Sequence, residues 1–131
     1  DGAVDGVEID GRVCDCCGTD VATTSDALLV VYRNRTAEET RDIQAARLVD
    51  GVWTSPVTVH ADGWRIDACP VNGPAVAAHG NEVAVAWQKK IDGRAIVAAS
   101  GDLDGDGVDE VVLGTWLSDG TGELLVLRRA P

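Results

Sequence analysis

The sequence predicts an all-β fold, and its composition, its short apolar runs and its internal repeats each support this class. The chain has 131 residues, with no Phe, no Met and one Tyr, so Val, Ala, Leu and four Trp supply most of its apolar volume. Small and β-branched residues interrupted by 15 glycines favour short strands and tight turns over helices. At this length a single domain, residues 1–131, is expected.

Two copies of a strand–turn–strand pattern follow one another along the chain. Residues 20–33 contain an apolar run, a polar turn at 25–26 and a second run that ends at Tyr32. Residues 74–87 repeat this pattern about 55 residues later, with Trp87 in the place of Tyr32. Such self-similarity at a fixed period indicates a repeat architecture.

A further apolar run follows each copy, and a partial third copy ends the chain. The added runs are 43–47, 96–99, 111–116 and 123–127, and an outer edge strand is expected at 53–59 because Pro56 cannot donate to a central ladder. Repeats of this size are typical of β-propeller blades. The predicted units are a Cys-containing lead-in (1–19), two blades (20–60 and 74–100) and a last blade (101–131) that begins with an acidic loop.

Two to three antiparallel blades are too few for a closed propeller, which typically has four to eight. Open sheets leave unpaired edges that other strands can join. The sequence therefore predicts an incomplete propeller, or one completed by self-association or by another subunit.

The acidic loop that opens the last unit predicts a calcium site. Carboxylates alternate there along a glycine-containing turn, and Ca²⁺ takes six to eight oxygen ligands. The predicted ligands are Asp102, Asp104, Asp106, the carbonyl of Val108 and Glu110. An EF-hand would need a bidentate Glu where Leu113 stands. An acidic turn that binds no ion is the alternative.

Two segments resemble known propeller repeats. Residues 101–114 resemble the FG-GAP (VCBS-type) repeat of integrin-type propellers, with Glu110 where that family has Asp. This resemblance covers about residues 101–127 and implies calcium that braces a turn. Residues 45–56 resemble the strand–turn–Trp phrase of sialidase-like (BNR-type) blades, a likeness that covers about 12–99 but lacks the Asp-box of that family.

The four cysteines predict either disulfides or a soft-metal site. Cys14, Cys16 and Cys17 form a cluster, and Cys69 lies far from them in the sequence. One interpretation is a disulfide from Cys69 to a member of the cluster, with the other two cysteines bridged locally or reduced. The alternative is thiolate binding of Cu or Zn, to which His60 and His79 could add ligands. A reactive or cross-linking thiol is a third interpretation.

A charged loop and a tryptophan-containing turn form a candidate binding surface. Its residues are Arg33, Arg35, Arg41, Trp64, Arg65 and Asp67. Exposed aromatic and Arg side chains are common at binding hot spots. The alternative interpretation of residues 33–42 is a solvated connection with internal ion pairs, and Tyr32 is expected to pack.

Charge and composition narrow the function. A net charge of −11 argues against nucleic acid or anionic membranes as partners, and no apolar run is long enough to span a bilayer. The cysteines and the calcium loop favour an extracytoplasmic location, either periplasmic or secreted. We expect a non-catalytic, calcium-stabilised module that binds a protein or a carbohydrate. The alternatives are a fragment or subunit of a sialidase-like glycoside hydrolase and a Cu- or Zn-binding protein.

Overall fold

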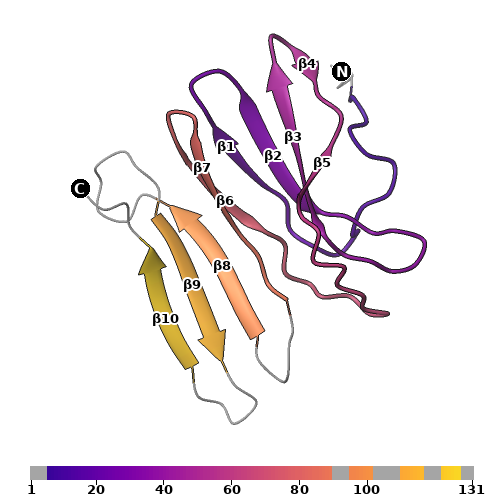
Figure 1. Ribbon diagram of the computed structural model, residues 1–131, viewed down its shortest axis with the longest axis vertical. Helices are drawn as coiled ribbons and strands as arrows, with labels where there is room; N and C mark the ends of the chain where they lie inside the picture. The colour runs from indigo at the N-terminus through magenta and orange to yellow at the C-terminus, as the bar shows by residue number, and fades with distance from the viewer. Residues whose placement is uncertain (1–5, 90–94, 102–109, 117–121, 128–131) are drawn as a thin grey trace, which may run out of the picture.

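The computed structural model describes residues 6–89, 95–101, 110–116 and 122–127, with side chains described for residues 6–89. These residues form antiparallel strands, which confirms the all-β prediction (Figure 1). The strands are β1 (Asp20–Thr23), β2 (Leu28–Arg33), β3 (Ile43–Val49), β4 (Val52–Trp53), β5 (Val57–His60), β6 (Ala75–His79), β7 (Glu82–Ala86), β8 (Ala95–Gly101), β9 (Glu110–Trp116) and β10 (Gly122–Leu127). Within those ranges no helix could cross a membrane.

The first sheet corresponds to the first predicted repeat. Its strand order is β1-β2-β3-β4, and β5 also pairs with β3. The edge strand expected at 53–59 is therefore divided into β4 and β5, with Pro56 in the break between them. A proline in this break is consistent with its inability to donate to a ladder.

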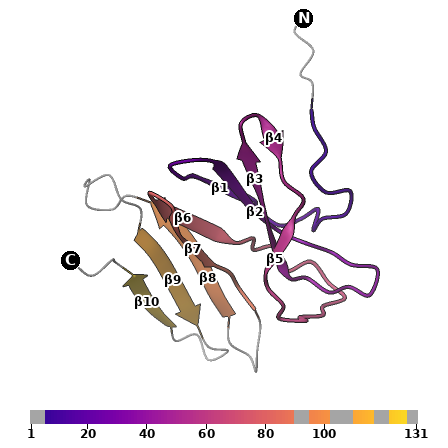
Figure 2. The ribbon, with the colours of Figure 1, turned by 45° about the horizontal axis from the view of Figure 1, so that its top comes forward.

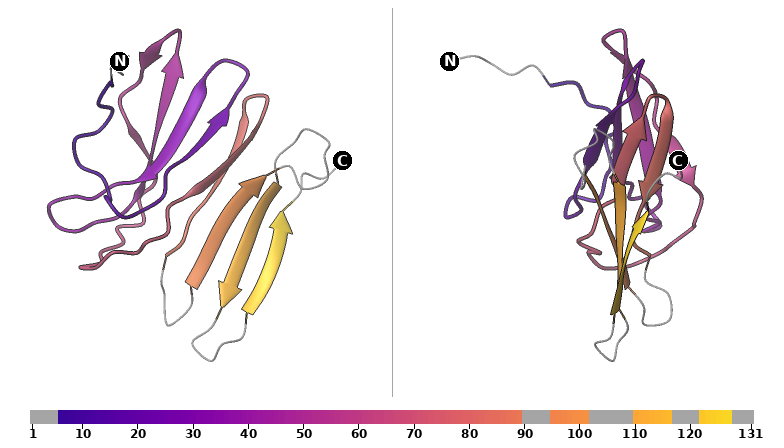
Figure 3. Two further views of the ribbon diagram at one scale, coloured as in Figure 1. Left: turned by 180° about the vertical axis from the view of Figure 1, so that it is seen from behind. Right: turned by 90° about the vertical axis from the view of Figure 1, so that its left-hand side faces the viewer.

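The remaining strands form a two-stranded sheet, β6-β7, and a three-stranded sheet, β10-β9-β8 (Figure 3). The 96–99 strand, expected to join the 74–87 copy, instead lies within β8 and pairs along the whole length of that strand with β9. The seven residues of β8 match the seven of β9, so this partner gives it a complete ladder. Internal similarity identified the strand correctly but could not identify its partner.

The core lies between the first sheet and β6. It consists of the buried side chains of Leu29, Val31, Ile43, Ala45 and Val76. The two hairpin turns also meet, since the Ser25 amide donates to the Gly80 carbonyl at 2.9 Å. These contacts hold β1 beside β6 (Figure 2). Alternate residues of β2 and β3 thus face β6.

The propeller itself remains a prediction, because none of the described sheets closes on itself. The segment 102–109 of the predicted calcium loop lies outside the described residues. Its two flanks are placed, because Gly101 pairs with Glu110 at the end of the β8–β9 ladder. The loop therefore connects the two strands of a hairpin.

Candidate functional site: disulfides above two buried arginines

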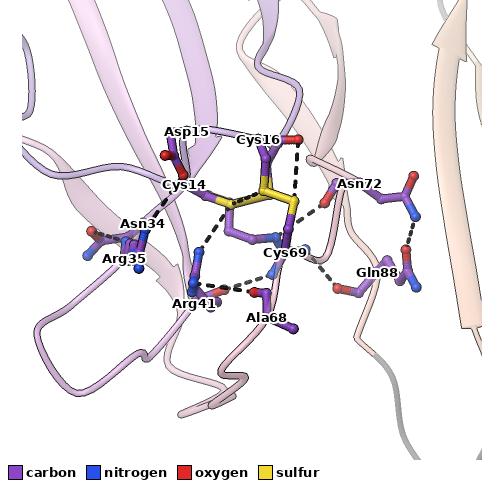
Figure 4. The surroundings of a disulfide bond; sticks show 12 residues. Cys14, Asp15, Cys16, Asn34, Arg35, Arg41, Ala68, Cys69, Asn72 and Gln88 are labelled. Carbon is purple, nitrogen blue, oxygen red and sulfur yellow. Dashed lines mark hydrogen bonds and ion pairs between the residues drawn. A yellow bond between two sulfur atoms is a disulfide. The ribbon is translucent and has the colours of Figure 1, made fainter.

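The four cysteines form two disulfides at one end of the first sheet (Figure 4). Cys16 bonds to Cys69, with 6.3 Å between their Cα atoms, and Cys14 bonds to Cys17, with a Cα separation of 5.5 Å. The predicted bridge from Cys69 to the cluster is confirmed. The local bridge joins Cys14 to Cys17, and their C-x-x-C spacing is the sequence signal that could have identified this pair.

Backbone contacts fix the cluster against β2. Val13 forms an isolated antiparallel bridge with Asn34, and the Cys14 amide donates to the Arg33 carbonyl at 2.9 Å. The lead-in therefore continues along the end of the sheet. Through Cys69, the second disulfide attaches this lead-in to the 64–73 segment, 53 residues away in the sequence.

The sulfur atoms lie close together but differ in exposure. The Sγ atoms of Cys14 and Cys16, which belong to different disulfides, are 3.7 Å apart. Cys14 is 5% exposed, Cys17 is half-buried, and Cys16 and Cys69 are exposed. The sulfurs of Cys14, Cys16 and Cys17 lie within 4.8 Å of one another, so this cluster could hold a metal ion once its disulfides are reduced to thiolates.

The two histidines are not part of this cluster. His60 Nε2 lies 3.8 Å from an Asp62 carboxylate oxygen, and the His60 ring stands 6.3 Å from that of Trp87. His79 ends β6, beside the turn to β7. The structure therefore does not bring the predicted extra metal ligands to the sulfurs.

Arg41 lies directly beneath the cysteines and is 3% exposed. One of its terminal nitrogens donates to Cys14 Sγ at 3.3 Å, and the other contacts Glu39 Oε2 at 2.6 Å and the Ala68 carbonyl at 3.4 Å. In the part of the chain with described side chains, its buried Nε has no hydrogen-bond partner. Arg41 thus places a positive charge beside the Cys14 sulfur.

Arg33 is the second buried arginine, at 2% exposed. It donates to three carbonyls, those of Arg41 at 2.7 Å, Gln88 at 2.7 Å and Asn72 at 3.3 Å. Its guanidinium also lies 5.0 Å from the centroid of the Trp64 ring. Burial lowers the pKa of Arg33 to about 10, and the charge of Arg41 adds to this effect while the charges of Asp62 and Asp42 oppose it. The side chain joins three loops at this end of the sheet.

Glu39, in the loop between β2 and β3, pairs with both half-buried Arg35 and buried Arg41. It accepts from Arg41 and, at 3.2 Å, from Arg35, which also lies 3.6 Å from Asp15. Partial burial raises the pKa of Glu39, but the hydrogen bonds from Arg41 and Arg35 outweigh it and hold the pKa below its ordinary 4.5. Glu39 also adopts a φ of 62°, which is uncommon for a residue other than glycine.

The predicted binding surface is corrected in part. Arg33 and Arg41 are buried, so they cannot contribute to an exposed surface or be solvated. The internal ion pairs of the alternative interpretation are present, between Arg35 and Glu39 at 3.2 Å and between Arg41 and Glu39 at 2.6 Å. Arg33 lies two residues beyond Val31 and four beyond Leu29 on β2, so it shares the strand face of these two core residues, and this spacing was a sequence signal for its burial. Arg65 and Asp67 are exposed, and Arg35 and Trp64 are half-buried.

Tyr32 is buried, as expected from its alignment with Trp87. Its hydroxyl donates to Asp10 Oδ2 at 2.7 Å. Burial raises the pKa of Tyr32 far above its ordinary 10.0, and the hydrogen bond and negative charge of Asp10 raise it further. The phenol therefore stays protonated at neutral pH.

Comparison with known proteins found no matching family model, no matching curated protein and no matching solved structure.

Proposed function

We propose that the chain is a non-catalytic β-module that binds a protein partner or a carbohydrate at the end of the first sheet where the disulfides lie. The observation that carries this proposal is the use of charged side chains as structural ties. Buried Arg33 donates to carbonyls in three loops, and buried Arg41 contacts Cys14, Glu39 and Ala68. Such ties hold the loops in one arrangement and so make the surface rigid. A rigid surface suits binding, because loops that are already ordered lose little conformational entropy when a partner binds.

The exposed residues at this end favour a protein partner over a carbohydrate. Glu38, Arg65 and Asp67 are exposed and of mixed charge, which suits a partner with a complementary charge pattern. Trp64 is less available for stacking on a sugar ring because the guanidinium of Arg33 lies 5.0 Å from its centroid. We therefore place the protein partner first.

The sialidase-like alternative finds little support in the same residues. That chemistry needs a Tyr nucleophile and open arginines for a carboxylate. Tyr32 is buried with a raised pKa, and its hydroxyl is bound to Asp10. The guanidiniums of Arg33 and Arg41 already have partners within the protein.

Calcium and an extracytoplasmic location belong to the same proposal. Two disulfides in a small domain indicate an oxidising compartment, which we extend to the periplasm or the outside of the cell. Asp102, Asp104, Asp106, Val108 and Glu110 would bind a Ca²⁺ that braces the β8–β9 hairpin. Strands of a second copy or of another subunit would complete the propeller.

A second candidate function is soft-metal binding by the reduced cysteines. The supporting observation is that the sulfurs of Cys14, Cys16 and Cys17 lie within 4.8 Å of one another. Thiolates select Cu(I) or Zn. Mass spectrometry of the reduced protein with each metal would test this candidate, and a metal-free spectrum would reject it.

The main test compares binding by variants at the two ends of the first sheet. Chemical cross-linking in the source cells should capture a partner with the native chain and lose it with Arg35→Ala/Arg65→Ala. The matched control is Val52→Ser/Ser55→Ala, which changes exposed residues near the β3–β4 turn at the opposite end. Binding to a glycan array that depends on the same two arginines would select the carbohydrate. Turnover of a fluorogenic sialoside by the folded protein would refute the proposal.

A further inference from the structure

We propose that the two neighbouring disulfides form a thiol–disulfide exchange site that takes an external thiol as its substrate. In this site the exposed Cys16–Cys69 bond accepts the thiol and passes the exchange to the Cys14–Cys17 bond. The inference goes beyond the proposed binding function and does not depend on it, because it rests on the positions and exposure of the cysteines and on the contacts of Arg41.

The first step follows from exposure. Exchange requires a thiolate to reach a disulfide sulfur, and both Cys16 and Cys69 are exposed whereas Cys14 is 5% exposed. Cys16 Sγ has the Cys14 sulfur at 3.7 Å on one side, which leaves Cys69 as the more open end. An external thiolate therefore attacks Cys69 Sγ, a mixed disulfide forms on Cys69, and Cys16 leaves as a thiolate.

The second step follows from proximity. The freed Cys16 sulfur starts 3.7 Å from Cys14 Sγ, and the sulfurs of Cys14, Cys16 and Cys17 all lie within 4.8 Å of one another. A short rotation of the released Cys16 side chain then brings its sulfur in line with the Cys14–Cys17 bond, as attack requires. Attack on Cys14 forms a Cys14–Cys16 bond, breaks the Cys14–Cys17 bond and leaves the electron pair on Cys17. A second external thiolate then attacks the mixed disulfide and releases Cys69. In total, two thiols are oxidised to one disulfide, and Cys17 and Cys69 take up their protons and two electrons.

Arg41 is a positioning residue for the second step. Its terminal nitrogen donates to Cys14 Sγ at 3.3 Å, and contacts with Glu39 and Ala68 hold the guanidinium in place. Its buried Nε has no partner among the described side chains, so the group retains donor capacity beside the sulfur. A positive charge at this point favours the charge that develops on the sulfurs during exchange.

The exchange also changes the structure of the loop end. The Cys16–Cys69 bond ties the lead-in to the 64–73 segment, whereas a Cys14–Cys16 bond lies within the lead-in alone. Exchange therefore detaches the 64–73 segment without leaving the cluster fully reduced. An external thiol would in this way loosen the loops around Trp64 and Arg65.

The decisive experiment identifies which thiols become free after two-electron reduction. The native protein is treated with glutathione, or separately with a C-x-x-C dithiol oxidoreductase, and is then trapped with N-ethylmaleimide and mapped by tandem mass spectrometry. We expect label on Cys17 and Cys69 with Cys14 bonded to Cys16. Label on Cys16 and Cys69 alone, at every time point and with both reductants, would overturn the proposal. The more effective reductant distinguishes a small thiol from a protein dithiol as the substrate.

Three variants isolate the steps. In Cys16→Ser/Cys69→Ser, the Cys14–Cys17 bond should be reduced about tenfold more slowly, since the internal thiol that acts at high effective concentration is lost. The matched variant Cys14→Ser/Cys17→Ser keeps the Cys16–Cys69 bond but lacks the acceptor of the second step, so its reduction should leave both Cys16 and Cys69 labelled. Arg41→Lys should lower the ratio of labelled Cys17 to labelled Cys16 about threefold without slowing the first step, because Lys lacks the fixed fork of Arg. Equal reduction of Cys14–Cys17 in the presence and absence of Cys16 would contradict the relay.

Discussion

Arg33 shows how a single charged residue can act as a core element. It lies on the same face of β2 as the core residues Leu29 and Val31, and three carbonyls from separate loops satisfy its donors. A buried charge is tolerated only with such partners. Arg33 therefore fixes the positions of these three loops relative to β2.

Arg33→Ala should lower the free energy of unfolding by about 3 kcal/mol, because it leaves buried carbonyls without donors and removes the guanidinium that lies over the Trp64 ring. Urea denaturation measures this change. The control is Arg47→Ala, which breaks an exposed ion pair with Asp26 at 2.7 Å and should cost less than about 1 kcal/mol. Similar losses for the two variants would contradict the structural role of Arg33.

The ionisation of Tyr32 can be followed directly because the chain has one tyrosine. Its folded pKa is raised above 10.0 by burial and by Asp10, so the native state keeps a proton that the unfolded state loses near pH 10. Its contribution to stability is complete below pH 10 and is lost as the pH rises further. Absorbance at 295 nm should show less than half ionisation at pH 10 in native protein and about half in guanidinium. Half ionisation of the folded protein at pH 10 would refute the burial of this hydroxyl.

At the scale of elements, the two disulfides should differ in their effect on stability. They span sequence separations of 53 and 3 residues, and the chain-entropy relation gives about 4 kcal/mol for the long loop and about 2 kcal/mol for the short one. Cys16→Ser/Cys69→Ser should therefore shift the urea midpoint more than Cys14→Ser/Cys17→Ser. The reverse order would indicate that the long bridge does not constrain the unfolded chain.

Sequence patterns predicted the strands better than the contacts between them. Alternating and continuous apolar runs located β1, β2, β6 and β7 because burial of a sheet face imposes a period of two. The same patterns could not identify the partner of β8. The hydrogen bonds between paired strands are made by backbone groups, and every apolar run offers the same backbone groups. The burial of Arg33 and Arg41 was not predicted because charged side chains are mostly exposed, although Arg33 kept the phase of the buried face.

At the scale of the whole molecule, the main question is what holds the last sheet together. Its ladder is continuous from Gly101–Glu110 to the far end of β9, and its hairpin connection carries the acidic residues of 102–109. A chain with a net charge of −11 repels itself, and a concentration of acids in one connection increases that cost. A bound cation would neutralise the repulsion among these acids and hold the turn in one conformation.

Calcium should therefore raise the melting temperature of the native chain, and Asp104→Ala should abolish most of that rise. A ligand that binds only the folded state stabilises it by mass action, by about 2.7 kcal/mol at a hundredfold excess over the dissociation constant. Differential scanning fluorimetry with Ca²⁺, with Mg²⁺ at equal ionic strength and with a chelator separates specific binding from charge screening. Asp50→Ala, at the exposed β3–β4 turn, removes the same charge outside the loop and should respond to Ca²⁺ like the native chain. An equal response to Mg²⁺, or an undiminished response in Asp104→Ala, would show that screening rather than a calcium site stabilises the hairpin.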